Sequence, residues 1–192
     1  MLNIVIFGPP GCGKGTQSNL IINKYNLTHL STGDIFRKNI KEESSLGELA
    51  KKYMDQGQLV PDQLTIDMLS QEMNNCKDSN GFIFDGFPRT LDQAKALDHL
   101  LSKMDQKISF TLSLDVSEKE LLNRLLLRGK QSGRVDDQSE LIIKNRIEVY
   151  KKQTLVLKDY YEKSGIFYQI NGEGEINDIT NAIFKVIDNY ID

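Results

Sequence analysis

The sequence predicts an α/β fold, a doubly wound parallel sheet with helices on both faces. Two short runs, 3–7 and 81–85, have continuously apolar centres, as do strands that are buried on both faces of such a sheet. Between and after them lie longer segments whose apolar residues recur at helical spacing. This alternation favours a single α/β domain, and 192 residues are enough to bury its core.

In the first half of the chain, the strand 3–7 leads through a Gly-rich turn into a helix predicted over 14–25. Ser31 and Thr32 are expected at the start of the next helix, because short hydroxyl side chains favour that position. A further helix is predicted over 63–75 and precedes the strand that ends at Asp85.

Capping residues mark the helix boundaries of the second half. Thr90 is expected to cap a helix that reaches residue 101, and Ser117 with Glu120 forms a predicted capping box. Gly165 is expected to end a long helix. The remaining predicted elements are a strand over 108–116, that long helix over 139–163, a strand over 166–170 and a terminal helix over 176–190.

Two stretches interrupt the alternation. Residues 31–60 contain predicted helices but no core strand, and residues 127–137 are polar and Gly-rich. Both are expected to be excursions from one core, which then comprises residues 1–30, 61–126 and 138–192.

Composition excludes several classes of protein. A net charge of -3 argues against general nucleic-acid binding, and no apolar run approaches the ~20 residues of a membrane span. The apolar stretch 2–7 is too short for a secretory signal. Cys12 and Cys76 form no CxxC or Cys/His pattern, and His29 and His99 have no partners at ligand spacing. A reduced, cytoplasmic setting is therefore predicted.

The segment Gly8 to Thr16 has the pattern of a phosphate-binding loop between a strand and a helix. Its glycines allow successive backbone N–H groups to face an anion, and Lys14 can reach β- and γ-phosphates. Gly15 stands where Ser or Thr usually ligates Mg²⁺, and Thr16 is displaced by one position. Mg²⁺ is therefore expected to be held mainly by phosphates and waters. Asp85 fits the carboxylate that orients metal-bound water.

Four segments resemble the signature segments of the adenylate kinase family, in the family's order and spacing: Gly-Pro-Pro-Gly-Cys-Gly-Lys-Gly-Thr (8–16), Ser-Thr-Gly-Asp (31–34), Asp-Gly-Phe-Pro-Arg (85–89) and Ser-Gly-Arg-Val-Asp-Asp (132–137). The short connection at 127–137 resembles the short-lid members, such as cytosolic animal enzymes. It lacks the longer, sometimes zinc-bearing lid of many bacterial members, so Mg²⁺ with ATP is expected and zinc is not.

The resemblance implies a five-stranded parallel sheet with a nucleoside-monophosphate-binding excursion at 31–60 and a short lid at 127–137. It implies reversible phosphoryl transfer from Mg-ATP to AMP, giving two ADP, by a cytoplasmic monomer. On the ATP side it implies Gly11, Cys12, Gly13, Lys14, Gly15, Thr16, Arg124, Arg128 and Gly174. On the AMP side it implies Thr32, Arg37, Gln58, Leu59, Val60, Gly86, Phe87, Pro88, Arg89, Gln93, Arg134 and Arg146. The implied catalytic groups are Lys14, Asp85, Arg89, Arg128, Arg134 and Arg146, with Asp136 and Asp137 in the lid.

The use of arginine supports this interpretation. The chain has 18 Lys but only 6 Arg, and all six arginines fall on positions that the resemblance assigns to nucleotide handling. The planar guanidinium group matches phosphate oxygens in pairs, which lysine cannot do.

Three alternatives differ in sequence features that can be checked. A UMP/CMP kinase of the same fold tends to have Ala where this chain has Thr32, and Asn where it has Thr90. A P-loop GTPase needs Asn-Lys-x-Asp, whereas residues 23–26 read Asn-Lys-Tyr-Asn, and a motor ATPase would have Glu at Gly86. A non-catalytic nucleotide sensor would be expected to have lost some of the arginines.

Overall fold

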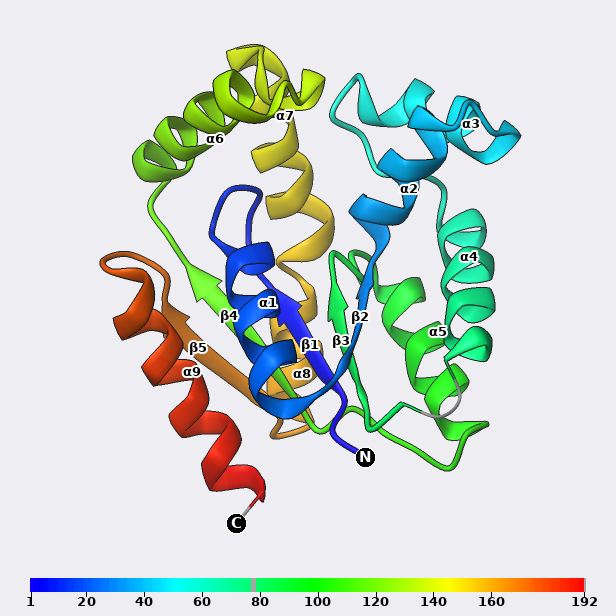
Figure 1. The fold of residues 1–192 in the computed structure, drawn as a ribbon, viewed down its shortest axis with the longest axis vertical. Helices are drawn as coiled ribbons and strands as arrows, with labels where there is room; N and C mark the ends of the chain where they lie inside the picture. The colour runs from blue at the N-terminus through cyan, green and yellow to red at the C-terminus, as the bar shows by residue number, and fades with distance from the viewer. Residues whose placement is uncertain (77–78, 192) are drawn as a thin grey trace.

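The computed structural model describes residues 1–76 and 79–191; residues 77–78 and 192, which belong to the predicted core ranges, lie outside the described part. Its centre is a five-stranded, all-parallel sheet with the order β2-β3-β1-β4-β5, which confirms the predicted fold class (Figure 1). The strands are β1 (Ile4–Phe7), β2 (Thr28–Ser31), β3 (Phe82–Asp85), β4 (Phe110–Asp115) and β5 (Phe167–Asn171).

Helices lie on both faces of this sheet (Figure 1). They are α1 (Lys14–Tyr25), α2 (Thr32–Lys41), α3 (Ser45–Met54), α4 (Asp62–Asn75), α5 (Leu91–Ser102), α6 (Glu118–Ser132), α7 (Glu140–Val149), α8 (Leu157–Lys163) and α9 (Ile176–Ile191). A short 3₁₀ helix, η1 (Val135–Asp137), follows α6, and a π-helical turn, η2 (Tyr150–Thr154), follows α7.

The two-residue repeat of β1 divides the core into two layers. Ile4 and Ile6 pack in one cluster with residues of α1, α6, α7 and α9, whereas Val5 and Phe7 pack in the other with residues of α4, α5 and α8. All four side chains are at most 3% exposed, and burying each one stabilises the fold by about 1.5–3 kcal/mol. Because β1 is buried on both faces, its carboxyl end is a rigid support for the loop that follows.

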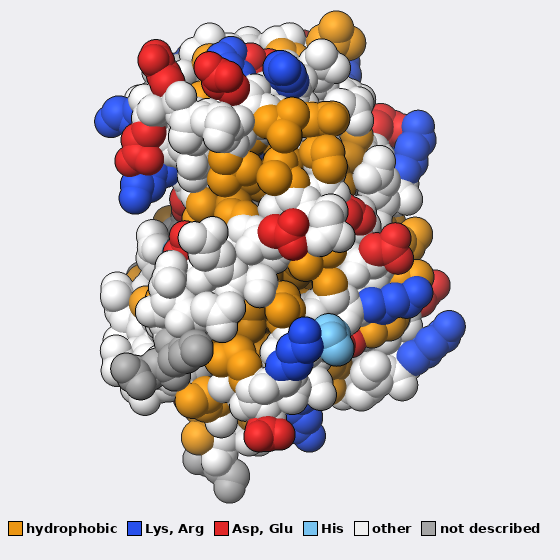
Figure 2. Space-filling model, turned by 90° about the vertical axis from the view of Figure 1, so that its right-hand side faces the viewer, with side chains coloured by type: hydrophobic (Ala, Val, Ile, Leu, Met, Phe, Trp, Pro, Cys, Tyr) orange, Lys and Arg blue, Asp and Glu red, His pale blue; other side chains and the backbone are white. Residues whose placement is uncertain are grey.

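The helices α2 and α3 form an excursion between β2 and α4, with a cluster of Phe36, Ala50, Val60 and Met68 beneath them. Gly47 allows the two helices to approach closely, since a Cβ atom there would lie 2.1 Å from the backbone oxygen of Asn39. Figure 2 shows the molecule from the side of α3, α4 and α5, where hydrophobic side chains gather in the upper half of the face.

One strand was not recognised from its pattern. Strand β2 has the sequence Thr-His-Leu-Ser, in which only one side chain is plainly apolar, and it lies at the edge of the sheet beside β3. Ser31 ends this strand and also caps α2, because its Oγ accepts from the N–H of Asp34 at 3.3 Å. The prediction of a helix start at Ser31 and Thr32 is therefore confirmed.

The segment predicted to be helical over 139–163 is helical in the structure, but it is not one regular α-helix. The chain forms α7, then the π-helical turn η2, then α8, and Gly165 follows with a φ of +69°. The N–H of Leu155 bonds the carbonyl of Tyr150 at 2.9 Å, five residues back, so the turn holds one residue more than an α-helical turn. Apolar spacing alone does not reveal such an insertion.

Of the two predicted caps, one is confirmed and one is wrong. The Oγ1 of Thr90 accepts from the N–H of Gln93 at 3.2 Å, as expected of an N-cap. Ser117 makes no side-chain cap bond; its N–H donates to Glu173 at 2.8 Å. Glu120 pairs instead with Arg124 at 2.7 Å. The predicted capping box fails because Glu120 is held by this arginine.

Candidate active site

A cavity of about 600 Å³ lies beyond the carboxyl ends of β1 and β3 and is also lined by α2, α6 and α7. The chain leaves β1 for β2 on one side of the sheet, and the later strands β4 and β5 lie on the other side. Ligands of doubly wound folds bind at such a reversal of strand order, at the carboxyl ends of the strands.

The loop between β1 and α1 forms one wall of the cavity. Gly8, Gly11 and Gly13 have φ values of +142°, +84° and +101°, a region that other residues rarely adopt. A Cβ atom at Gly8 would lie 2.8 Å from the carbonyl oxygen of Leu114. Because Gly13 is the N-cap of α1, no side chain competes for the first N–H groups of the helix. These groups and the helix dipole favour an anion.

Lys14 is held against this loop. Its Nζ donates to the carbonyl oxygens of Gly8 and Pro9 at 2.8 and 2.9 Å, and lies 3.6 Å from the Sγ of Cys12. The ammonium group is therefore held against the carbonyl oxygens at the start of the loop. Cys12 itself is 1% exposed and packs in the core cluster of α1 and α6.

Asp85 faces the loop from the end of β3. Its Oδ2 would be 3.9 Å from a Cβ atom at Gly15, and it lies 3.6 Å from the Nε2 of His29 on β2. Register in the sheet explains this placement, since β1 and β3 are neighbours and Ile6 lies opposite Asp85.

Arg89 lies deeper, where the chain turns from β3 into α5. Its Nε donates to the carbonyl of Gly86 at 2.7 Å, and the Oγ1 of Thr32 donates to the same oxygen at 2.9 Å. Burial, together with the positive charge of Arg146, lowers the pKa of Arg89 to about 10. The fold thus holds a desolvated cation close to others, which is characteristic of a site for a multiply charged anion.

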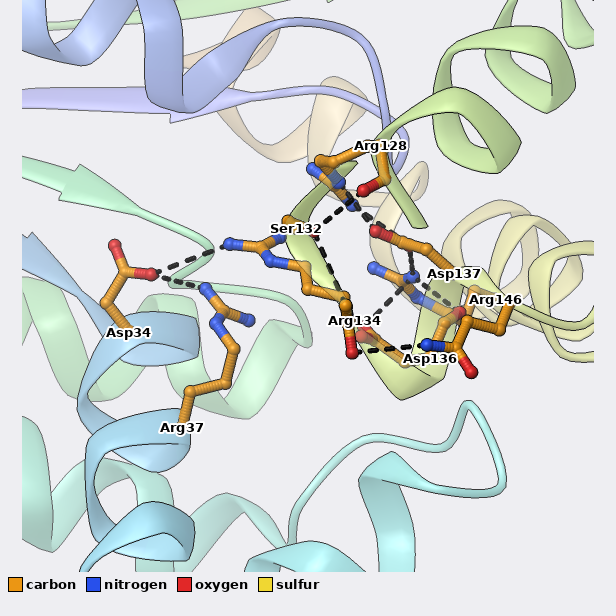
Figure 3. A network of polar contacts seen from close by, with 10 residues as sticks. Asp34, Arg37, Arg128, Ser132, Arg134, Asp136, Asp137 and Arg146 are labelled. Carbon is orange, nitrogen blue, oxygen red and sulfur yellow. Dashed lines mark hydrogen bonds and ion pairs between the residues drawn. The ribbon is translucent and has the colours of Figure 1, made fainter. Parts of the chain in front are cut away.

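Three further arginines lie around two aspartates that follow α6, and two of the three contact these aspartates (Figure 3). Arg128 contacts Asp137 with two nitrogens at 2.6 and 3.0 Å, and Arg146 contacts Asp137 at 2.5 Å and Asp136 at 3.0 Å. Arg134 extends the other way, to 3.8 Å from Asp34 of α2. The network therefore links α6, η1 and α7 to the helical excursion.

The buried carboxylate of Asp137 is ionised because of these partners. Burial favours its neutral form, but hydrogen bonds from Arg128 and the charge of Arg146 outweigh this effect and hold the pKa of Asp137 below its usual value. Asp34 is similar: burial opposes ionisation, and the bond from Arg37 lowers its pKa. The aspartates hold the neighbouring arginines in place but occupy only some of the five N–H donors of each guanidinium group.

Arg124 lies at the other end of the cavity. It donates to Glu120 at 2.7 Å and to the carbonyl of Gly172 at 3.0 Å, so it joins α6 to the segment after β5. Gly174 in that segment also lines the cavity and has a φ of +104°. A flat ligand group between Arg124 and this backbone would be held by stacking and backbone contacts.

The wall formed by α4 and α5 carries Gln93, which is 2% exposed. Its Nε2 donates to Asp62 at 2.8 Å, and its Oε1 accepts from the N–H of Arg89 at 2.7 Å. Gln58, Leu59 and Val60, from the segment before α4, line the same region.

The structure brings almost all the predicted site residues to this one cavity. The exceptions are Phe87, which is 1% exposed in the core beneath α5, and Asp137, which acts on the cavity only through Arg128 and Arg146. The residues that line it are Gly11, Cys12, Gly13, Lys14, Gly15, Thr16, Thr32, Arg37, Gln58, Leu59, Val60, Asp85, Gly86, Pro88, Arg89, Gln93, Arg124, Arg128, Arg134, Asp136, Arg146 and Gly174.

Sequence reasoning missed four residues that support the site: Asp34, Asp62, Tyr150 and Thr154. Asp34 belongs to a recognised motif but was given no role. Tyr150 and Thr154 lie in the π-helical turn, which the spacing hid within a longer helix. Within 1–76 and 79–191, no three His, Cys, Asp or Glu side chains are grouped as metal ligands, and no helix is long and apolar enough to cross a membrane.

Known proteins are similar to this chain along almost its whole length. The family model described as adenylate kinase matches residues 6–166. An adenylate kinase of Flavobacterium psychrophilum is 54% identical over 189 residues, which cover 98% of this chain and 100% of that protein. One from Bacteroides fragilis is 53% identical over 188 residues, covering 98% and 99%. One from Parabacteroides distasonis is 51% identical over 189 residues, covering 98% and 99%. The chain belongs to the adenylate kinase family.

Proposed function

We propose that this protein catalyses reversible phosphoryl transfer from Mg-ATP to AMP, giving two ADP. The observation that carries the proposal is the convergence of the phosphate-binding loop and all six arginines on one cavity. Two nucleotides that meet at the transferring phosphate require several cations between their two bases. The arginines and Lys14 that line this cavity support such an arrangement. ATP, AMP and ADP are its proposed partners.

The donor nucleotide is assigned to the end of the cavity formed by the loop. Its phosphates would lie on the N–H groups of Gly11 to Thr16 with Lys14 beside them. Arg124 and the segment at Gly174 would hold its base, because they form the far end of the same wall.

The acceptor is assigned to the end formed by α2, α4 and α5. Arg37 and Arg89 lie where its phosphate would be, and Thr32, Val60 and Gln93 surround the place of its base. The contacts of Thr32 and Arg89 with the same carbonyl, that of Gly86, fix the turn on which this end is built.

Transfer requires alignment and neutralisation of charge more than proton removal. An oxygen of the AMP phosphate attacks the γ-phosphorus of ATP, and the bond from that phosphorus to the β–γ bridging oxygen breaks. No base is needed, because the attacking phosphate is already an anion. Lys14, Arg89, Arg128, Arg134 and Arg146 are proposed to stabilise the transferring group; one arginine in such a role contributes about 10³–10⁵ in rate.

The residues present fit a Mg²⁺ ion bound through phosphates. Asp85 faces the loop, since its Oδ2 would lie 3.9 Å from a Cβ atom at Gly15. Its carboxylate is therefore suited to hold a water molecule of a phosphate-bound ion. The ion would supply charge that bridges the phosphates. Thr16, displaced by one position, lines the cavity but is exposed.

The excursion at 31–60 and the lid at 127–137 are proposed to close over the nucleotides. In the structure, residues 127–132 are the last part of α6, and Arg134 spans from the lid to Asp34 of the excursion. Closure would exclude water, which otherwise could take the phosphoryl group. We further propose that the enzyme works in the cytoplasm as a monomer.

Turnover on AMP, CMP, UMP and GMP with Mg-ATP, measured side by side, tests the acceptor assignment. We expect a clear preference for AMP, because Thr32 and Gln93 stand at the acceptor end. A preference for CMP or UMP would instead identify a pyrimidine nucleotide kinase of the same fold.

A further inference from the structure

The amide of Gln93 is held at both ends by protein groups. Its Nε2 donates to the Oδ1 of Asp62 at 2.8 Å, and its Oε1 accepts from the N–H of Arg89 at 2.7 Å. The other carboxylate oxygen of Asp62 accepts from the hydroxyl of Thr90 at 2.5 Å. That hydroxyl oxygen in turn accepts from the N–H of Gln93 at 3.2 Å. Asp62, Thr90 and Gln93 therefore form a closed set of contacts between the first turns of α4 and α5.

Chemistry permits only one orientation of this amide. If it were flipped, its oxygen would face the carboxylate of Asp62 and its NH₂ group would face the N–H of Arg89. Two acceptors would then meet at one end and two donors at the other, at a side chain that is 2% exposed. Each buried polar group left without a partner is costly, so the observed orientation is fixed by its neighbours.

Fixing the amide also fixes what Gln93 offers to the cavity. The NH₂ group has two hydrogens, of which Asp62 takes one, and the carbonyl oxygen has two lone pairs, of which Arg89 takes one. One donor and one acceptor remain, in a set order. Along its Watson–Crick edge, adenine presents an amino donor and a ring-nitrogen acceptor. A 6-oxo purine presents the reverse order there, a carbonyl acceptor and a ring N–H donor.

We propose that Asp62 determines the base specificity of the acceptor site, by holding the amide of Gln93 in the orientation that accepts a 6-amino purine and rejects a 6-oxo purine. The inference rests on the proposed assignment of Gln93 to the acceptor base. Asp62 is a specificity-determining residue that acts through Gln93, because its two carboxylate oxygens are occupied by Gln93 and Thr90.

The substitution Asp62→Asn tests this role with little change in shape. An asparagine can turn its NH₂ group toward Gln93. The oxygen of a flipped Gln93 amide would then face a donor in place of a carboxylate, so the preference for the observed orientation weakens. We expect the ratio of kcat/KM for AMP to that for IMP to fall roughly tenfold or more, as for the loss of one base-discriminating pair. The KM for ATP should not change.

Asp67→Asn is the matched control. Asp67 lies on the same helix, is exposed, and also accepts from a glutamine amide, that of Gln63 at 2.8 Å. We expect its AMP/IMP ratio to equal that of the unaltered protein. If the AMP/IMP ratio of kcat/KM in Asp62→Asn also stayed within about twofold of the ratio in the unaltered protein, the role of Asp62 would be disproved.

A third variant separates this inference from the proposed function. Gln93→Met should raise the KM for AMP, because the base loses both of its contacts there. If Gln93→Met raises that KM while Asp62→Asn leaves selectivity unchanged, the inference fails and the acceptor site stands. If Gln93→Met has no effect on AMP, the assignment of the base itself fails, and the role of Asp62 falls with it.

Discussion

At the scale of single residues, Arg89 gives the clearest support for the proposed phosphate site. Its burial and the nearby charge of Arg146 lower its pKa to about 10, so it stays charged at neutral pH in an environment that opposes charge. The bond from its Nε to Gly86 fixes the plane of the guanidinium group. Such an arrangement costs stability in the absence of an anion and is useful only when one binds.

Arg89→Lys is expected to lose far more activity than stability. Lysine cannot present two donors in one plane, so kcat should fall by about 10²–10³, while the thermal midpoint should change by no more than a few degrees. Turnover and thermal unfolding of the same preparation check this. Near-normal turnover of the variant would remove Arg89 from the catalytic groups.

Most of the residues that line the cavity could be predicted from the sequence, because the four motif segments fix the spacing between them. Two residues of recognised motifs are exceptions. Phe87 packs in the core at 1% exposure while its neighbours Pro88 and Arg89 line the cavity, and Asp137 is buried behind the arginines that it binds. Asp62 and Thr154 could not be found, since a lone Asp before a helix or a Thr within one is usually structural. Only their contacts in the folded chain show what they support.

At the scale of elements, Asp137 holds the junction of α6, η1 and α7 together. It is fully buried and binds Arg128 and Arg146, and these bonds lower its pKa despite its burial. A carboxyl group with a lowered pKa in the folded state adds stability above its unfolded pKa of about 3.9. That stability is lost as the pH falls through the lower, folded value.

Asp137→Asn should therefore reduce the free energy of unfolding by about 1–3 kcal/mol at pH 7, the value of bonds to a charged group. Below about pH 4 the difference between the two proteins should shrink, because the carboxyl group of the unfolded chain is then protonated while the native one is still ionised. It should disappear once the pH has fallen below the lowered pKa of the native carboxyl group. Urea unfolding at pH 7 and pH 3 measures this. A difference that stays constant with pH would show that the charge of Asp137 is not what stabilises the junction.

The π-helical turn η2 joins α7 to the deepest part of the site. Thr154, at its end, is 5% exposed, and its hydroxyl donates to the carbonyl of Arg89 at 2.9 Å. Thr154→Val is expected to lower kcat/KM for AMP roughly fivefold to tenfold, because one hydrogen bond to the Arg89 main chain is lost. Thr154→Ser should restore it, and the KM for ATP should stay the same in both.

Thr180→Val provides the control for that substitution. Thr180 is 6% exposed and its hydroxyl also bonds within the core, to Gln17 at 2.9 Å and Ile176 at 2.7 Å. Both valine variants should lose similar stability, and only Thr154→Val should alter the kinetics with AMP. Equal kinetic effects would mean that the contact with Arg89 has no special role.

Elements with strong patterns were predictable and those with weak patterns were not. Strands β1 and β3 have mostly apolar side chains, whereas β2, which is equally short, is largely polar. It forms because it can pair with β3 at the edge of the sheet. The break between α7 and α8 arises from one inserted residue, which hydrophobic spacing does not register. Tertiary contacts decide both cases.

At the scale of the whole molecule, the fold gathers on one cavity the cations that we propose to lie between two nucleotides. The loop after β1 and the turn after β3 lie at neighbouring strand ends, while α2 and the lid carry arginines over them from either side. The resemblance of four short segments implied this plan, and the match to the adenylate kinase family over residues 6–166 agrees with it.

The most direct test of this account is incubation of the purified chain with Mg-ADP alone, with ATP, AMP and free phosphate measured over time. We expect ATP and AMP to appear in equal amounts with no release of phosphate, because the acceptor rather than water receives the phosphoryl group. Release of phosphate, or no conversion of ADP, would contradict the proposal that this cavity transfers a phosphoryl group between two adenine nucleotides.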